Sequence, residues 1–181
     1  SDSFSDSEEH LSAMLSNKSL LSTAMHVDDK GIIELKEYVS ETYSVLRNWI
    51  SPILLDVLSK NKHVEYPQKI FEEGIVTHHD GKTITDEHRL ALATTHAQAN
   101  FTEVKQALAF ILDSLRVPYA VQEYDHPSCI PGRSARVIIN GKTTGFLGEI
   151  HPRVLKHFDL ELPVAVLELT IDAMHSTDKS T

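Results

Sequence analysis

The clearest helical pattern in the first half of the chain covers residues 45–58. Apolar side chains recur there at the spacing of one helix face: Val45, Leu46, Trp49, Ile50, Ile53, Leu54, Val57 and Leu58. Pro52 lies inside this pattern, and a proline cannot donate the backbone hydrogen bond that a helix interior needs. We therefore expect a break near Ser51, with Ser51 as the N-cap of a second helix and Pro52 in its first turn.

A second amphipathic pattern predicts a helix over residues 102–117. Thr102 is suited to the N-cap position, where its hydroxyl can accept a hydrogen bond from the first turn. The apolar face of this helix is formed by Val104, Leu108, Ile111, Leu112 and Leu115. A shorter helix is expected over residues 151–159, because Pro152 fits its first turn.

Shorter segments have the composition of strands, and two of the turns between them have hairpin signatures. The expected strands cover residues 30–39, 68–79, 88–97, 119–125, 134–139, 142–150 and 163–172. Asp80-Gly81 and Asn140-Gly141 are residue pairs that favour tight hairpin turns. The last strand is almost continuously apolar, which is typical of a strand at the centre of a sheet.

Two hairpins indicate a mostly antiparallel sheet, with the helices packed against one face. The predicted fold class is therefore α+β rather than a doubly wound parallel sheet. Gly132, Gly145 and Gly148 match neither of the glycine-rich fingerprints that bind nucleotide phosphates.

Charge and composition narrow the function further. The 181 residues carry a net charge of -9, which argues against a nucleic-acid groove along this surface. No apolar run reaches the roughly 18 residues of a membrane helix, so we expect no membrane partner and no signal peptide. The single cysteine excludes an internal disulfide and favours a reducing compartment.

The stretch "HPSCIPGRSA" at residues 126–135 raises a question of chemistry. His126 and Cys129 form a candidate base and nucleophile, which would make the chain a thiol-dependent hydrolase. The alternative, which we favour, is a loop shaped by its prolines, with a small buried thiol. In that interpretation Gly132 supplies an unusual backbone angle, and Arg133 pins the loop through buried hydrogen bonds.

Two further groups of polar residues are candidates for a metal or acid–base site. His78, His79, Asp80 and His96 suggest a metal-dependent hydrolase. Adjacent residues of a strand point to opposite faces, however, so the two neighbouring histidines cannot both join one site. The same argument separates Glu72 from Glu73. A polar hairpin end and solvent-facing carboxylates are the simpler interpretation.

Four stretches, in this order, resemble the C-terminal core of phenylalanyl-tRNA synthetase β subunits of the archaeal and eukaryotic type. They are "SVLRNWISPILLDVLSKNKH", "YPQKIFEEGIV", "FTEVKQALAFILDSL" and the segment from "HPSCIPGRSA" to "PVAVLELTIDAM". The combination of "PGRSA", "GFLGEIHP" and "PVAVLEL" is specific. The resemblance covers residues 31–174, so we divide the chain into a poorly matched segment 1–30, a core domain 31–174 and a flexible tail 175–181.

The resemblance implies a fold like that of class II synthetase catalytic domains, in a non-catalytic copy. A class II site needs an arginine in its second-motif strand, whereas the comparable strand here offers Lys69, Glu72 and Glu73. It also needs a late third-motif arginine, and the chain has none after Arg153. We therefore expect no catalytic, cofactor-binding or metal-binding residue in this chain.

The resemblance also implies partners. This domain would pack on the catalytic α subunit of a cytoplasmic (αβ)2 heterotetramer, which uses ATP and magnesium to attach phenylalanine to its tRNA. The wide apolar arc of residues 42–62 is the expected contact with α, with Leu46, Trp49, Ile50, Ile53 and Val57 as candidates. A core position for Trp49 is the alternative. A stand-alone relative with a binding or regulatory role also remains open.

Overall fold

The computed structural model describes residues 14–36, 40 and 43–174. The helical elements of this part are α2 (Lys18–Leu21), η1 (Thr23–Met25), α3 (Ser51–Lys60), α4 (Phe101–Ser114), α5 (Pro152–His157) and η2 (Ile171–Met174). The strands are β1 (Leu15–Ser16), β2 (Ile33–Glu34), β3 (Val45–Leu46), β4 (Gln68–His79), β5 (Ile84–Thr95), β6 (Ala120–Glu123), β7 (Cys129–Ile139), β8 (Lys142–Ile150) and β9 (Val164–Thr170). No helix among these is long and apolar enough to span a membrane.

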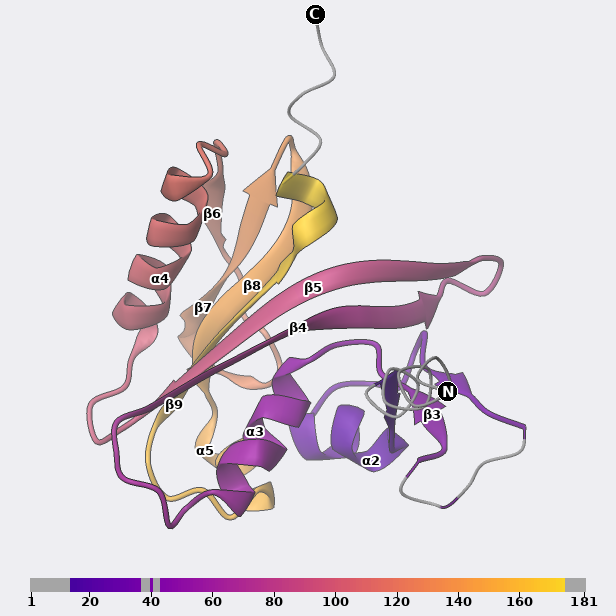
Figure 1. The fold of residues 1–181 in the computed structure, drawn as a ribbon, viewed down its shortest axis with the longest axis horizontal. Coiled ribbons are helices and arrows are strands. Elements are labelled where there is room, and N and C mark those ends of the chain that lie inside the picture. The colour runs from indigo at the N-terminus through magenta and orange to yellow at the C-terminus, as the bar shows by residue number, and fades with distance from the viewer. Residues whose placement is uncertain (1–13, 37–39, 41–42, 175–181) are drawn as a thin grey trace, which may run out of the picture.

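The large sheet has six strands in the order β4-β5-β9-β8-β7-β6, and every neighbouring pair is antiparallel. This confirms the predicted α+β class and the central position of the last apolar strand, β9. The Asn140-Gly141 turn also has the expected geometry: both residues have positive φ, at 52° and 75°, as a tight hairpin between twisted strands requires. A small sheet of order β1-β3-β2 lies beside the distal part of the β4–β5 hairpin (Figure 1).

Helices cover both faces of the sheet, not one face as the sequence predicted. Figure 1 shows α4 on one side of the sheet and α3 on the other. Leu54, Leu55 and Leu58 of α3 belong to one buried cluster, whereas Val104, Leu108 and Leu112 of α4 belong to a second. A central strand with both faces buried explains why β9 is apolar at successive positions.

The helix predicted over residues 45–50 is wrong. Val45 and Leu46 form β3, and α3 begins at Ser51, with Pro52 in its first turn as expected. Ile50, not Ser51, is the N-cap residue. Its hydrocarbon side chain cannot accept a hydrogen bond from the first turn of the helix. The helix predicted over residues 102–117 is confirmed as α4, but it begins at Phe101. The Asn100 side chain accepts a hydrogen bond from Glu103 N–H, so Asn100 has the cap role that was assigned to Thr102.

A buried carboxylate supplies the missing cap of α3. Glu168 on β9 is 2% exposed, and its carboxylate accepts hydrogen bonds from Ile50 N–H at 3.0 Å and Ser51 N–H at 2.7 Å. It also accepts from Ser51 Oγ at 2.7 Å and from Arg89 Nη1 at 3.0 Å. The first N–H groups of a helix have no partner within the helix and favour negative charge. Glu168 therefore joins α3 to the centre of the sheet.

The segment before α3 is tied into the same core. Leu21 and Met25 are fully buried in the cluster that contains the α3 leucines. Met25 O accepts a hydrogen bond from Ser128 Oγ, which precedes β7. The residues that the structure describes from α2 onward thus form part of the folded unit.

The first prediction concerns Glu168. Glu168→Gln should lower the free energy of unfolding by about 3–5 kcal/mol, because it leaves Arg89 beside a neutral group and presents an amide N–H₂ to helix N–H donors. Urea denaturation measures the change. The matched control is Glu123→Gln on exposed β6, which should cost less than about 0.5 kcal/mol. Equal stability of the two variants would contradict a structural role for the Glu168 charge.

Candidate functional site: a cleft on one face of the sheet

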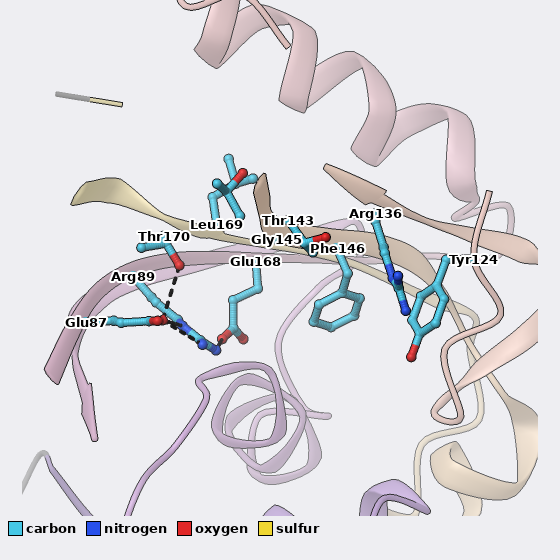
Figure 2. Close-up of a pocket in the computed structure, with 11 residues that line it drawn as sticks. Glu87, Arg89, Tyr124, Arg136, Thr143, Gly145, Phe146, Glu168, Leu169 and Thr170 are labelled. Atoms are coloured by element: carbon cyan, nitrogen blue, oxygen red, sulfur yellow. Dashed lines mark hydrogen bonds and ion pairs between the residues drawn. The ribbon is translucent and has the colours of Figure 1, made fainter. Parts of the chain in front are cut away.

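A cleft of about 460 Å³ opens on the α3 side of the sheet. Figure 2 shows its walls, which are formed by Glu87, Arg89, Tyr124, Arg136, Thr143, Thr144, Gly145, Phe146, Glu168, Leu169 and Thr170. The register places Arg136 opposite Phe146 and Phe146 opposite Glu168, so these side chains form one row across β7, β8 and β9. The row continues to Ala91 on β5. The antiparallel pairing therefore brings together residues that are distant in the sequence.

One end of the cleft is an ion-pair network. Arg89 donates to Glu87 Oε2 from Nε at 3.0 Å and from Nη2 at 2.8 Å, and it donates to Glu168 Oε2 from Nη1 at 3.0 Å. Burial works against the charge of Arg89, but the carboxylates of Glu168 and Glu87 outweigh it and raise the pKa of the guanidinium. Arg89 is thus always charged and is fully engaged by this chain's own carboxylates.

The other end of the cleft holds a second arginine. The guanidinium carbon of Arg136 lies 3.7 Å from the centre of the Tyr124 ring, in cation–π contact. Figure 2 shows the two side chains next to each other, with Phe146 between them and Glu168. Within residues 14–36, 40 and 43–174, no carboxylate forms an ion pair with Arg136.

His126 lies in an aromatic cluster beside the cleft. Its ring stacks on Phe146 at a centroid distance of 4.3 Å and lies 5.7 Å from the ring of Trp49. Burial lowers the pKa of His126 to about 4, and its Nδ1 accepts a hydrogen bond from Ser128 N–H. His126 is therefore a neutral packing residue near pH 7.

Cys129 does not have the surroundings of a nucleophile. Its side chain is buried, and burial, with a contribution from the Glu149 charge, raises the pKa of the thiol to about 12. The thiolate, which is the reactive form of cysteine, is therefore scarce near neutral pH. A base of low pKa beside a thiol of high pKa cannot activate it, so the geometry does not favour the thiol hydrolase.

The candidate metal residues are dispersed. His79 Nδ1 accepts from Gly81 N–H, which stabilises the hairpin turn, while His96 Nε2 pairs with Glu103 at 2.5 Å. His78 lies on the other side of β4 from His79, with its Nε2 3.9 Å from Glu87. Among the residues that the structure describes, no group of three or more histidine, cysteine or acidic side chains could hold a metal ion.

The stretch predicted as a loop is the irregular start of β7. Cys129 pairs with Ile150, and the regular register resumes only at Ser134. Gly132 has φ of +76° in this bulge, and its N–H donates to Asp125 Oδ1 at 2.8 Å, as its proposed backbone role requires. Arg133 Nη1 donates a hydrogen bond to Glu149 Oε2 at 2.8 Å, which ties this stretch to β8, but the Arg133 side chain is 58% exposed, so the bond is not a buried one.

The candidate interface residues divide into three groups. Ile50 is fully buried and Trp49 is 8% exposed, with its indole Nε1 donating to Leu21 O at 2.9 Å. Leu46 and Ile53 are half-buried, and Val57 on α3 is 36% exposed. The wide apolar arc predicted for one helix does not form, because residues 45–50 are not helical. Trp49 and Ile50 instead belong to the buried cluster that also contains Leu21 and Met25. Trp49 thus has the core position weighed as the alternative.

Sequence reasoning missed the residues that line the cleft: Glu87, Arg89, Arg136 and Glu168. A signal was present for one of them. Glu168 is a single charge within the apolar run "VAVLELT". A carboxylate in a buried strand is rare unless it is paired, so this position indicated a buried partner. Nothing in the sequence indicated that the partner was Arg89.

The family model for the phenylalanyl tRNA synthetase beta chain CLM domain matches residues 5–171. The chain belongs to this family.

Three relatives share the name phenylalanine–tRNA ligase beta subunit. The protein of Thermococcus kodakarensis is 43% identical over 149 residues, which cover 80% of this chain and 26% of the relative. That of Methanococcus maripaludis is 40% identical over 172 residues, covering 91% and 31%. That of Pyrococcus abyssi is 37% identical over 172 residues, covering 93% and 31%. The chain therefore spans between a quarter and a third of the length of these relatives.

The second prediction concerns His126, which is half-buried in the aromatic cluster. Because the pKa of His126 falls from 6.5 to about 4 on folding, the unfolded chain binds more protons at this residue between those values. The free energy of unfolding should therefore rise with pH across that window, by at most about 3 kcal/mol from this group. His126→Asn, which keeps an acceptor near Nδ1 but cannot titrate, should remove this part of the slope.

Urea denaturation from pH 4 to 7.5 measures the effect as the difference between wild type and variant. The control is His63→Asn, because His63 is exposed and takes part in no ion pair among the residues that the structure describes. If the free energies of unfolding of wild type and His126→Asn differ by the same amount at every pH, burial does not suppress the charge of His126.

Proposed function

We propose that this chain is a non-catalytic module of the β subunit of a phenylalanine–tRNA ligase. The observation that carries this proposal is the match of the family model to residues 5–171, which include every strand of the six-stranded sheet. The names of the relatives point to the same enzyme. We further propose that the sheet is a non-catalytic version of the class II synthetase catalytic domain.

The charges of the cleft support a non-catalytic role. Transfer of phosphate needs cations that are free to stabilise the charge on the phosphate oxygens. Arg89 is paired with Glu87 and Glu168, so it is not free to bind the oxygens of a triphosphate. On β4, Glu72 binds Arg47, while Lys69 is exposed and lies on the opposite face of the strand from Glu72. Neither β4 nor β5 therefore offers a free arginine to ATP.

In this proposal the enzyme's chemistry belongs to its partner. The catalytic α subunit would bind ATP, magnesium and phenylalanine in a cytoplasmic (αβ)2 assembly, and tRNA would bind the complete enzyme. The core domain over residues 31–174 would act as a scaffold that holds α in place. A rigid sheet with helices fixed on both faces is suited to that role.

The accessible side of α3 is the proposed contact with α. Trp49 and Ile50 are buried in this chain and have little surface left for a partner. Val57, Ile53 and Leu46 keep accessible apolar surface, and Tyr43 nearby is 45% exposed. We therefore keep the α3 region as the interface and move its centre from Trp49 to Val57.

The third prediction tests catalysis directly. The isolated chain should show no phenylalanine-dependent exchange between ATP and pyrophosphate, because Arg89, the arginine of β5, is already paired with Glu87 and Glu168. The positive control is the complete enzyme assembled from α and the full-length β subunit. Exchange that rises in proportion to the concentration of the isolated chain would contradict the non-catalytic role.

The fourth prediction tests the α3 interface. Val57→Glu in the full-length β subunit should weaken association with α by about tenfold or more, because it places a charge in an apolar contact. The melting midpoint of the isolated domain should stay unchanged, since Val57 is 36% exposed. Co-purification and analytical ultracentrifugation measure the association.

The matched control is Phe110→Glu, which puts the same charge on an apolar side chain of α4 that is 75% exposed. This variant should bind α as wild type does. If the two variants bind α equally well, the outer side of α3 is not the contact.

A further inference from the structure

Arg136 is a charged group without a charged partner in a cleft where every other charge is paired. Its guanidinium lies against the Tyr124 ring, which satisfies one face of the group but accepts none of its N–H hydrogen bonds. Glu87 and Glu168, the two carboxylates that line the cleft, are both paired with Arg89 at the end away from Arg136. Within the part of the chain that the structure describes, Arg136 is thus free to pair with an anion that enters the cleft.

The space beside Arg136 has the size and lining of a small-molecule site. About 460 Å³ is within the range of ligand pockets, which combine apolar walls with a few polar groups. The Phe146 and Tyr124 rings line the cleft, as Figure 2 shows, although His126 stacks on Phe146 and Arg136 lies over Tyr124. Thr143 also lines the cleft, and the Thr170 hydroxyl donates to Glu87 at 3.3 Å. A guanidinium fixed on an aromatic ring presents parallel N–H donors, which match the two oxygens of a carboxylate.

We propose that this cleft binds a small monocarboxylate with a flat apolar body, with its carboxylate on Arg136 and its body against Phe146. The carboxylates of Glu87 and Glu168 in the same cleft favour a single negative charge over a phosphate dianion, because like charges repel in a partly dry site. The site performs no chemistry on its ligand. It goes beyond the scaffold role, and it does not depend on contact with the α subunit.

Phenylacetate is the probe, and the chain carries its own reporter. Trp49 is the single tryptophan, and its ring lies 6.1 Å from that of Phe146. Phenylacetate should change the fluorescence of Trp49 saturably and shift the backbone amide resonances of Gly145 and Phe146. Arg136→Gln should raise the dissociation constant by about tenfold or more, since a hydrogen-bonded ion pair is lost. Arg136→Lys, which keeps the charge but not the fork, should have a smaller effect.

Arg133→Gln is the matched control, because it removes an exposed arginine of the same strand that pairs with Glu149 outside the cleft. It should bind phenylacetate as wild type does. Benzylamine, which carries the opposite charge, and inorganic phosphate should bind more weakly than phenylacetate. Because no α subunit is present, failure of this binding experiment is distinct from failure of the scaffold proposal.

Three outcomes would overturn the proposal. They are the absence of saturable binding at tens of millimolar phenylacetate, an unchanged dissociation constant for a folded Arg136→Gln, and benzylamine binding as tightly as phenylacetate. If Arg136→Gln does not fold, the wild-type amide shifts decide: shifts centred on Gly145 and Phe146 support the site, and shifts centred elsewhere reject it.

Discussion

A buried carboxylate on the central strand determines how the layers of this domain fit together. Glu168 is costly to remove from water, and it is stabilised by the N-terminus of α3 on one side and by Arg89 on the other. Both partners must be in place before the carboxylate is satisfied. The position of α3, the rotamer of Arg89 and the path of the chain through Ile50 are therefore coupled through one side chain.

A second glutamate performs the corresponding task on the opposite face. Glu149 on β8 accepts a hydrogen bond from Phe101 N–H, at the start of α4. It also forms an ion pair with Arg133. Side chains of neighbouring central strands thus bind the N-termini of the two longest helices, one on each side of the sheet. Asn100 completes the cap of α4, whereas α3 has no cap from its own sequence and depends on Glu168. The N-terminus of α3 therefore depends on a carboxylate from the sheet more than the N-terminus of α4 does.

The same network shapes the cleft. Because Glu168 and Glu87 neutralise Arg89, the part of the sheet nearest to α3 is electrostatically complete and offers nothing to a phosphate. Arg136 lies two strands away from Glu168, with Phe146 between them, and is outside the network. A domain that fixes its helices with charges on the sheet face has fewer charges left for catalysis, which supports the non-catalytic role proposed above. The aromatic cluster of Trp49, His126 and Phe146 lies beside the cleft and adds no group that titrates near neutral pH.

The sequence by itself determined the elements whose signals are local. The Asn140-Gly141 hairpin, the helix from Phe101 and the buried strand of β9 follow from backbone preferences and apolar spacing, and these act within a few residues. The family resemblance also came from the sequence, through the order of its four stretches. Tertiary structure decided between helix and strand where the local pattern allowed both. Residues 45–50 have helical spacing, yet Val45 and Leu46 pair with β1 and β2, and the helix starts only where Glu168 accepts the first N–H groups. The fate of Trp49 and the pairing of Arg89 with Glu168 were likewise outside the reach of the sequence pattern, because both depend on segments that meet only after the sheet has formed.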